Sequence, residues 1–430
     1  MSIIERGRRF REWLHGLGRR TPWQERRCPF CRGHDTWKHG SYRRRPWTLD
    51  GRHALRMQRY RCRVCRRTFT PEVAVVAPRQ RYGRDVRRCA LDLWQHGGTS
   101  VRRTAEWVRS LVGRQERWRL WRPWNGAPGA DSDRCRLGAS TVARWLDDAG
   151  QRAQQTVPRH LAGVPTSGQA GVDGLWAKLT GKTKAVVLLL SDRVHGVAYP
   201  PVVVPDEEAP AHWGRLFLRT ARAGWRPSRI RGVVSDGTRG LAQFLEGRLV
   251  WVHHQRCVFH IWRNLAKPLR QALTLAATGV HGAAATAVKR AARRELVTLI
   301  RTVLDAPDDA AAVGALGMLA AHRLGADLAR ALRNEIEHLL VYQGAANVGL
   351  GRVGPEWHWR DFRLRLSRGR NHRTRARLER AALLWATYHN FEPAQWRSEH
   401  KRTYRRRGRS PLAMAGLPPG DVSYLDALAI

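Results

Sequence analysis

The stretch from Gly171 to Pro268 constrains the fold of this 430-residue chain more than any other part. It alternates short apolar runs with amphipathic segments in the order strand, strand, strand, helix, strand, helix, strand, helix. Strands interleaved with helices in this way predict a mixed sheet with helices packed on its faces. We therefore expect an α/β domain in this part of the chain.

Two of the apolar runs carry an aspartate at or near their ends, Asp173 in AGVDG and Asp236 in RGVVSDG. A carboxylate at the end of a buried strand lies at an edge of the sheet, where a cation or a substrate can reach it. If the two side chains meet, their oxygens suit Mg²⁺ or Mn²⁺ better than Zn²⁺. An aspartate after a short strand is also common in purely structural settings, so the pair is the stronger indication.

The charge balance indicates what the chain binds. Lys and Arg number 78 against 35 Asp and Glu, which gives a formal net charge of +43. An excess this one-signed favours a polyanionic partner, DNA or RNA, over an ordinary solvated surface. We expect no membrane partner, because no stretch approaches the ~20 apolar residues of a spanning helix. The N-terminus lacks a signal-peptide core, and the cysteine usage fits a reducing cytoplasm.

Two Cys-x2-Cys pairs, Cys28 with Cys31 and Cys62 with Cys65, stand at either end of a segment that alternates and turns like a β-ribbon. Four thiolates close a tetrahedral shell that suits structural Zn²⁺ and leaves no open position for catalysis. The alternative is four reduced thiols without a metal. We predict a zinc-ribbon domain over residues 23–78, after a basic lead-in over 1–22.

Residues 79–154 show three amphipathic helical patterns, over 81–97, 98–111 and 137–150. They predict a helix-turn-helix DNA-binding domain, although a plain three-helix packing module has the same pattern. Thr99 or Ser100 can cap the second helix, and Ser140 can cap the third. The third helix is short and begins with small polar residues, as a major-groove recognition helix requires. Turn residues over 155–170 predict a linker.

Basic and small polar side chains of these two N-terminal domains are the expected DNA contacts. They are Arg43, Arg44 and Arg45 of the ribbon, with Ser140, Thr141 and Arg144 of the third helix.

Three motifs in the central stretch carry a resemblance to a known family. They are Val172-Asp173-Gly174, the run VVSDG that contains Asp236, and QRCVFHIWRNL with Cys257 and His260. The stretch resembles Mutator-type transposases of bacterial insertion sequences. That resemblance implies a ribonuclease-H-like core in which Asp173 and Asp236 are the first two acids of a DDE triad, interrupted by an all-α insertion.

The expected fold class is therefore α/β, a ribonuclease-H-like mixed sheet with an all-α insertion, preceded by a zinc ribbon and a helix-turn-helix domain. The catalytic domain is expected in two parts, 171–268 and 346–395. The insertion is expected over 269–345, and a basic tail over 396–430.

The third acid of the triad is expected after the insertion. The tail from Tyr388 resembles the end of insertion-sequence transposases, in which the glutamate lies well before an Asn-containing motif, here at Asn390. This spacing favours Glu356. Glu379 is the alternative third acid, and Asp361 is the next candidate.

Cys257 and His260 stand three residues apart on a predicted helix, so their side chains share a face and could ligate a metal together. No second ligand pair follows nearby. We therefore favour a structural role close to the active site over a zinc site.

The resemblance implies a bacterial DNA transposase in which Asp173, Asp236 and Glu356 hold two Mg²⁺ or Mn²⁺ ions for DNA cleavage and strand transfer. The implied partners are the double-stranded ends of the element and target DNA, bound by a homodimer associated with the nucleoid in the cytoplasm. A catalytically inactive DNA-binding regulator derived from a transposase is the alternative from another class. A ribonuclease-H-like nuclease is a third possibility.

Overall fold

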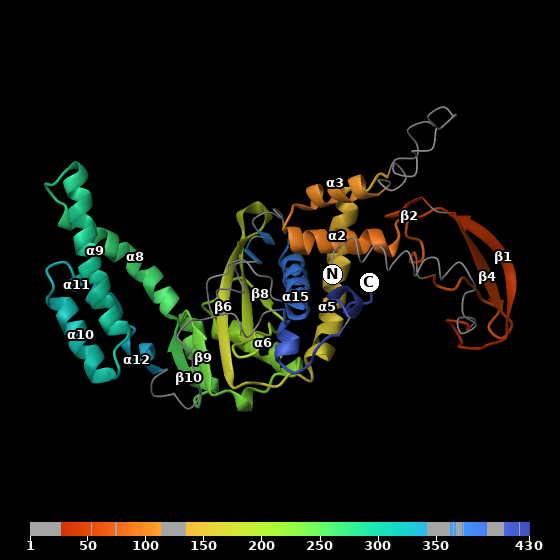
Figure 1. The fold of residues 1–430 in the computed structure, drawn as a ribbon. Coiled ribbons are helices and arrows are strands. Elements are labelled where there is room, and N and C mark those ends of the chain that lie inside the picture. Colours follow the sequence, from red (N-terminus) through yellow and green to blue (C-terminus); the bar gives the residue numbers. More distant parts are fainter. Residues whose placement is uncertain are drawn as a thin grey trace. The chain divides into compact units, whose positions relative to one another are not determined.

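The computed structural model of the protein describes residues 27–52, 54–73, 75–112, 135–341, 362–363, 365–366, 372, 374–393, 408–420 and 422–430. Its elements are labelled in Figure 1. The chain forms two compact units. One comprises Met1–Trp145 with Ile430, and the other comprises Leu146–Ala429.

The first unit begins with a small antiparallel sheet. Strand β4 (Leu55–Cys62) pairs on one side with β1 (Thr36–Arg44) and on the other with β5 (Thr68–Phe69). A separate pair joins β2 (Trp47–Thr48) to β3 (Gly51–Arg52). The buried apolar cluster of the three-stranded sheet consists of Cys28, Cys62 and Phe69. A core this small cannot hold a sheet together without further cross-links.

Helices follow in the same unit. Helix α2 (Arg84–Gly97) buries Val86, Leu91 and Trp94 on one face. Helix α3 (Val101–Leu111) is capped by Ser100, whose side chain accepts a hydrogen bond from the backbone of Arg103. Of the two caps that the sequence allows, the structure has Ser100 and not Thr99.

Helix α5 (Ala139–Leu161) differs from its prediction at both ends. It begins one residue before Ser140, so Ser140 lies inside the first turn and is not the cap. The carbonyl of Gly138 accepts the first helical hydrogen bonds, from Thr141 and Val142. The helix continues past Gly150 and Pro158, so the start of the expected linker over 155–170 is helical.

The second unit contains a five-stranded sheet. Its strands are β6 (Gln169–Lys178), β7 (Lys184–Asp192), β8 (Val202–Val204), β9 (Gly232–Ser235) and β10 (His253–Arg256), in the order β10-β9-β6-β7-β8. The pairs β6–β7 and β7–β8 are antiparallel, whereas β6–β9 and β9–β10 are parallel. The predicted mixed α/β fold is confirmed.

Two strands are much shorter than their apolar runs suggest. The run over 194–204 is a strand only at β8, because Gly196 turns the chain with a φ of +78° and two prolines at 200 and 201 cannot donate ladder hydrogen bonds. The run over 248–257 is a strand only at β10. Apolar character predicted burial correctly over 196–204 but not over 248–257, where Val250 and Trp251 are exposed.

Helices cover both faces of the sheet (Figure 1). Every second residue of β7 from Ala185 packs with Leu378, Ala382 and Trp385 of α15 (Arg375–Phe391). Because side chains alternate along a strand, the intervening buried residues of β7 face the other side. Helix α6 (Pro210–Arg222) contacts β7 and β8, and α7 (Arg239–Arg248) packs beside α6.

The part of the insertion that the structure describes, up to residue 341, is helical. Helix α8 (Val258–Ala276) extends from the sheet to α9 (Gly282–Leu304), α10 (Asp309–Ala321) and α11 (Ala326–Arg333), and the short α12 (Ile336–Leu339) follows (Figure 1). These helices share an apolar cluster that includes Leu296, Ile300, Leu319, Leu328 and Leu332. Among the described helices, none has the length and apolar character needed to cross a membrane.

Candidate functional site

Asp173 lies in the middle of β6 and not near the end of a strand, which corrects the sequence-based expectation. Strand β6 continues to Lys178 because it pairs with β7 along its whole length, with Asp173 opposite Leu189. The side chain is buried, and its Oδ1 accepts a hydrogen bond from the backbone N–H of Gly174 at 2.9 Å. Asp173 therefore lies on the central strand of the sheet.

Asp236 reaches the same place from the next strand. Strand β9 pairs in parallel with the start of β6, with Val234 opposite Gly171. Asp236 lies two residues after Val234, just past the end of β9, and Asp173 lies two residues after Gly171 on β6. The parallel register is therefore the reason why two aspartates 63 positions apart in the sequence come together.

A buried arginine holds the turn after β9. The guanidinium of Arg256 donates a hydrogen bond to the carbonyl of Asp236. It also forms two bonds to Glu335, from Nε to Oε2 at 2.5 Å and from Nη2 to Oε1 at 2.9 Å. Glu335 directly precedes the short α12 and connects the end of the insertion to the backbone of a candidate site residue.

The turn after β9 requires glycine at position 237. Its φ is +74°, and a Cβ atom there would lie 1.2 Å from Nη1 of Arg256. We expect Gly237→Ala to displace Arg256 and to add backbone strain of about 1–3 kcal/mol. The expected loss in Tm is roughly 3 °C or more, since 1 kcal/mol shifts Tm by about 2–4 °C in a domain of this size.

The matched control for that variant is Gly247→Ala, because a Cβ at Gly247 meets no atom within 4 Å. Gly247 lies in α7, so alanine there is expected to be neutral or slightly stabilising. The Tm values of both variants, measured by thermal unfolding, test this prediction. Equal Tm values for the two alanine variants would contradict the role of Arg256 as a fixed support of the turn.

His260 joins the two aspartates. Ligand atoms of Asp173, Asp236 and His260 all lie within 4.8 Å of one another, and this group could hold a metal ion. Cys257, just before α8, is buried but is not a member of that group. The structure thus divides the Cys-x2-His pair: His260 lies with the acids, and the backbone N–H of Cys257 donates to the carbonyl of Ser235 at 2.7 Å.

Glu207 belongs to the same place, and the sequence analysis missed it. It follows β8 and lines a pocket of about 230 Å³ whose other lining residues are Gly174, Trp176, Asp236, His260, Arg263, Asn264 and Arg363. Its Oε1 accepts a hydrogen bond from the indole of Trp176 at 2.8 Å. The only signal in the sequence was the acidic run Asp206-Glu207-Glu208, which does not show which member points inward.

Burial raises the pKa of the Glu207 carboxyl above its ordinary value. The hydrogen bond from Trp176 works against that rise, and the negative charge of Asp236 adds to it. A pKa raised by burial and by a neighbouring charge, in a group that lines a pocket, indicates a candidate functional residue.

The candidates for the third acid have different outcomes. Glu379, on α15, forms an ion pair with Arg219 of α6 and is not a member of the group around Asp173. Glu356 and Asp361 lie outside the residues that the structure describes. Glu356 therefore stays a prediction.

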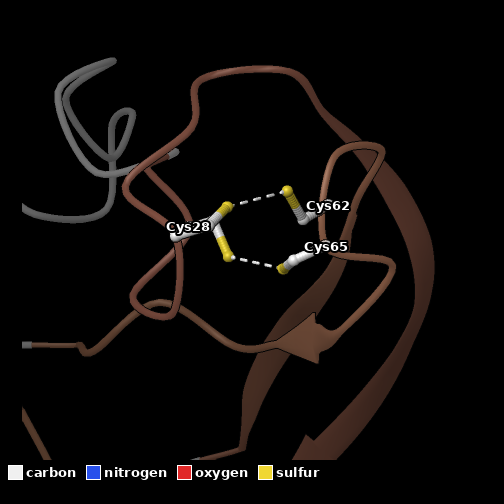
Figure 2. Close-up of side chains that lie close together, drawn as sticks. Cys28, Cys62 and Cys65 are labelled. Atoms are coloured by element: carbon white, nitrogen blue, oxygen red, sulfur yellow. Dashed lines mark hydrogen bonds between the residues drawn. The ribbon is translucent and has the colours of Figure 1, made fainter.

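The four predicted zinc ligands form a second candidate metal centre. Sulfur atoms of Cys28, Cys31, Cys62 and Cys65 lie within 4.8 Å of one another, and the cluster could bind zinc. Cys28 and Cys65 are 3.5 Å apart, as are Cys31 and Cys62. Figure 2 shows the thiols of the two knuckles directed toward each other.

Hydrogen bonds within the cluster lower the pKa of one thiol and raise that of another. Burial disfavours the thiolate of Cys28, but hydrogen bonds from the backbone of Cys31 and Phe30 and from the Cys65 and Cys31 thiols outweigh it and lower the pKa of Cys28 to about 7. A backbone hydrogen bond from Arg67 lowers the pKa of Cys65, but burial and the bonds with the other three thiols outweigh it and raise that pKa to about 11. Thiolates are the form that ligates metals. The donor set, its closed arrangement and the small core around it therefore fit structural Zn²⁺.

The predicted DNA contacts lie on the surface with two exceptions. Arg43, Arg45, Ser140 and Arg144 are exposed. Arg44 instead donates hydrogen bonds to the carbonyls of Ala77 and Gln80, so it supports the end of the ribbon. Thr141 is partly buried and accepts a hydrogen bond from Arg144 at 3.4 Å.

Residues 201–276 match the model of the transposases of the Mutator family. The matched segment runs from β8 to α8 and contains Glu207, Asp236, Cys257 and His260, whereas Asp173 and the zinc-type cysteines lie before it. No curated protein matched the chain. The resemblance seen in the sequence motifs is confirmed for this segment, and it implies DNA as a partner.

Proposed function

We propose, from the Mutator family transposase segment over residues 201–276, that this chain is a DDE-type transposase of a bacterial insertion sequence. It would cleave phosphodiester bonds at the ends of the element and join them to target DNA. The observation that carries the proposal is the meeting of Asp173, Asp236 and His260 in one buried group, built partly from the matched segment.

The sheet supports a ribonuclease-H-like core. Its order β10-β9-β6-β7-β8 places the strand with Asp173 at the centre, next to the parallel strand that ends before Asp236. Helices on both faces and a helical insertion after β10 agree with that fold.

Asp173 and Asp236 have the donor atoms that Mg²⁺ and Mn²⁺ prefer. Such ions would stabilise the attacking and leaving oxygens of a phosphodiester exchange. We expect Asp173 to contact both ions, Asp236 to hold one, and Glu356 to hold the other. Arg263 and Arg363 line the same pocket, where their charges would orient a phosphate of the DNA backbone.

The N-terminal unit is proposed to recognise the ends of the element. Its cysteine cluster would hold Zn²⁺ and thereby the ribbon, while exposed Arg43, Arg45 and Arg144 would contact DNA. We further propose that the chain acts as a homodimer on paired ends of the element and that it is associated with the nucleoid in a bacterial cytoplasm.

The test is a joining assay with the full chain, Mg²⁺ and a donor plasmid that carries the DNA flanking its own coding sequence. Joined products in a target plasmid are expected. Hydrolysis without joining would favour a ribonuclease-H-like nuclease. Specific binding with neither reaction, under Mg²⁺ and under Mn²⁺, would favour an inactive regulator and overturn the proposal.

A further inference from the structure

Glu207 has a buried carboxylate oxygen that the fold does not satisfy. The residue is 9% exposed, and its Oε1 accepts from Trp176. Among the described residues, Oε2 has no hydrogen-bond partner. A buried acceptor without a hydrogen-bond partner destabilises the folded state, and more so when the group is charged. We therefore expect the unpaired oxygen of Glu207 to have a function.

The backbone leaves room for that oxygen. A Cβ atom at Gly174 would lie 2.2 Å from Oε2 of Glu207, so the absence of a side chain at Gly174 opens the space into which Oε2 points. Gly174 directly follows Asp173 on β6. Glu207 and Asp236 line one pocket, and the negative charge of Asp236 contributes to the raised pKa of Glu207.

We propose that Glu207 is a ligand for a divalent cation of the Mg²⁺ and Mn²⁺ class in this pocket, shared with Asp236. The inference rests on the proposed metal-dependent function and deepens it by assigning a ligand that precedes α6. It is not the third acid expected after the insertion. A cation there satisfies Oε2 and balances the like charges of Glu207 and Asp236.

A purely structural role for Glu207 would be to accept the indole hydrogen bond of Trp176. That role uses Oε1 alone, and a neutral amide oxygen can fill it equally well. Glu207→Gln therefore separates the two roles, because it keeps the acceptor for Trp176 and removes the charge.

The experiment measures cation binding to the full chain without DNA, by Mn²⁺ electron paramagnetic resonance and by Tb³⁺ luminescence. Trp176 lies beside Glu207 and can transfer excitation to a Tb³⁺ ion bound there. We expect Glu207→Gln to weaken Mn²⁺ binding roughly tenfold or more, since even outer partners of metal ligands contribute about 10- to 100-fold. Trp176→Phe should lower the sensitised emission at saturating Tb³⁺.

Glu208→Gln is the matched control, because Glu208 is the neighbouring acid and is exposed. It should bind Mn²⁺ like the parent chain. Binding by Glu207→Gln equal to that of Glu208→Gln would overturn the inference. If Glu207→Gln does not fold, Glu207→Asp decides the question, because it retracts the carboxylate by one methylene and should also weaken binding; unchanged affinity would overturn the inference.

Asp236→Asn distinguishes this inference from the proposed function. If Asp236→Asn loses Mn²⁺ and Glu207→Gln does not, the metal site stands and only the assignment of Glu207 fails. If neither substitution changes Mn²⁺ affinity, the metal-dependent function fails with it. Circular dichroism of each variant shows that the fold is intact.

Discussion

Replacing Asp173 or Asp236 by asparagine is expected to lower the rate of DNA strand joining by roughly a thousandfold or more. Asparagine keeps the size of the side chain and removes the negative charge that a divalent cation requires. A thousandfold loss corresponds to about 4 kcal/mol of transition-state stabilisation. If the proposed two-ion site holds, the loss of one carboxylate ligand is expected to reach that value, because both ions would stabilise developing charge.

The measurement is the joining assay, with DNA binding followed in parallel by an electrophoretic shift. Binding should persist in both variants, because Asp173 and Asp236 add no positive charge to the DNA-contacting surface. Asp327→Asn is the control: Asp327 is exposed on α11 and, among the residues that the structure describes, pairs with Arg330 three residues on. Joining at the parent rate by both the Asp173 and the Asp236 variant would refute the transposase proposal.

Cys62→Ser is expected to unfold the three-stranded sheet of the N-terminal unit and to release its zinc. Cys62 ends β4 and lies 3.5 Å from Cys31. In the part of this unit that the structure describes, the buried cluster consists of Cys28, Cys62 and Phe69, with the partly buried Tyr60 and Cys65 packed against it. Zinc binding to small structural sites is worth about 10–16 kcal/mol at neutral pH, so most of the stability of such a sheet depends on the metal.

Two measurements check this prediction. Elemental analysis of the parent chain should find one zinc per chain, and amide hydrogen exchange should show protection of β1 and β4. Both signals should disappear in Cys62→Ser and in the parent chain treated with a chelator. Cys135→Ser is the control, since Cys135 is outside the cluster. A parent chain that lacks zinc and still protects β4 would contradict the assignment.

The alternation of apolar and amphipathic segments predicted the central sheet and its covering helices, because burial on both faces leaves a clear pattern in sequence. The same pattern overstated β8 and β10. The apolar residues just before Pro200 and Pro201 are buried outside any strand, whereas Val250 and Trp251 before β10 are exposed. Strand pairing depends on backbone donors that the pattern does not record.

The paired cysteines were predicted from the sequence alone, because zinc chemistry restricts both residue type and spacing. The two aspartates were predicted from the apolar runs that contain them and from the resemblance to a family. Glu207 could not be identified in this way. It belongs to a run of three acids, and only the packing of the loop before α6 directs one of them toward Gly174 and leaves its neighbour Glu208 exposed.

Glu335 and Glu379 show the same limit. Glu335 directly precedes α12 and Glu379 lies on α15, positions where an acid is ordinarily solvated, yet one pairs with Arg256 and the other with Arg219. Each ion pair joins residues far apart in the chain, so the helical periodicity of the sequence does not predict it.

By itself, the sequence determined the class of fold, the four candidate zinc ligands, two acids of the candidate centre and the resemblance to Mutator family transposases over part of the chain. These depend on local composition and spacing. Tertiary structure alone decided that Asp173 lies inside a central strand, that His260 and not Cys257 lies with the acids, and that Glu207 lines the pocket. The physical reason is that strand register and loop packing are set by contacts between distant segments, which no local pattern encodes.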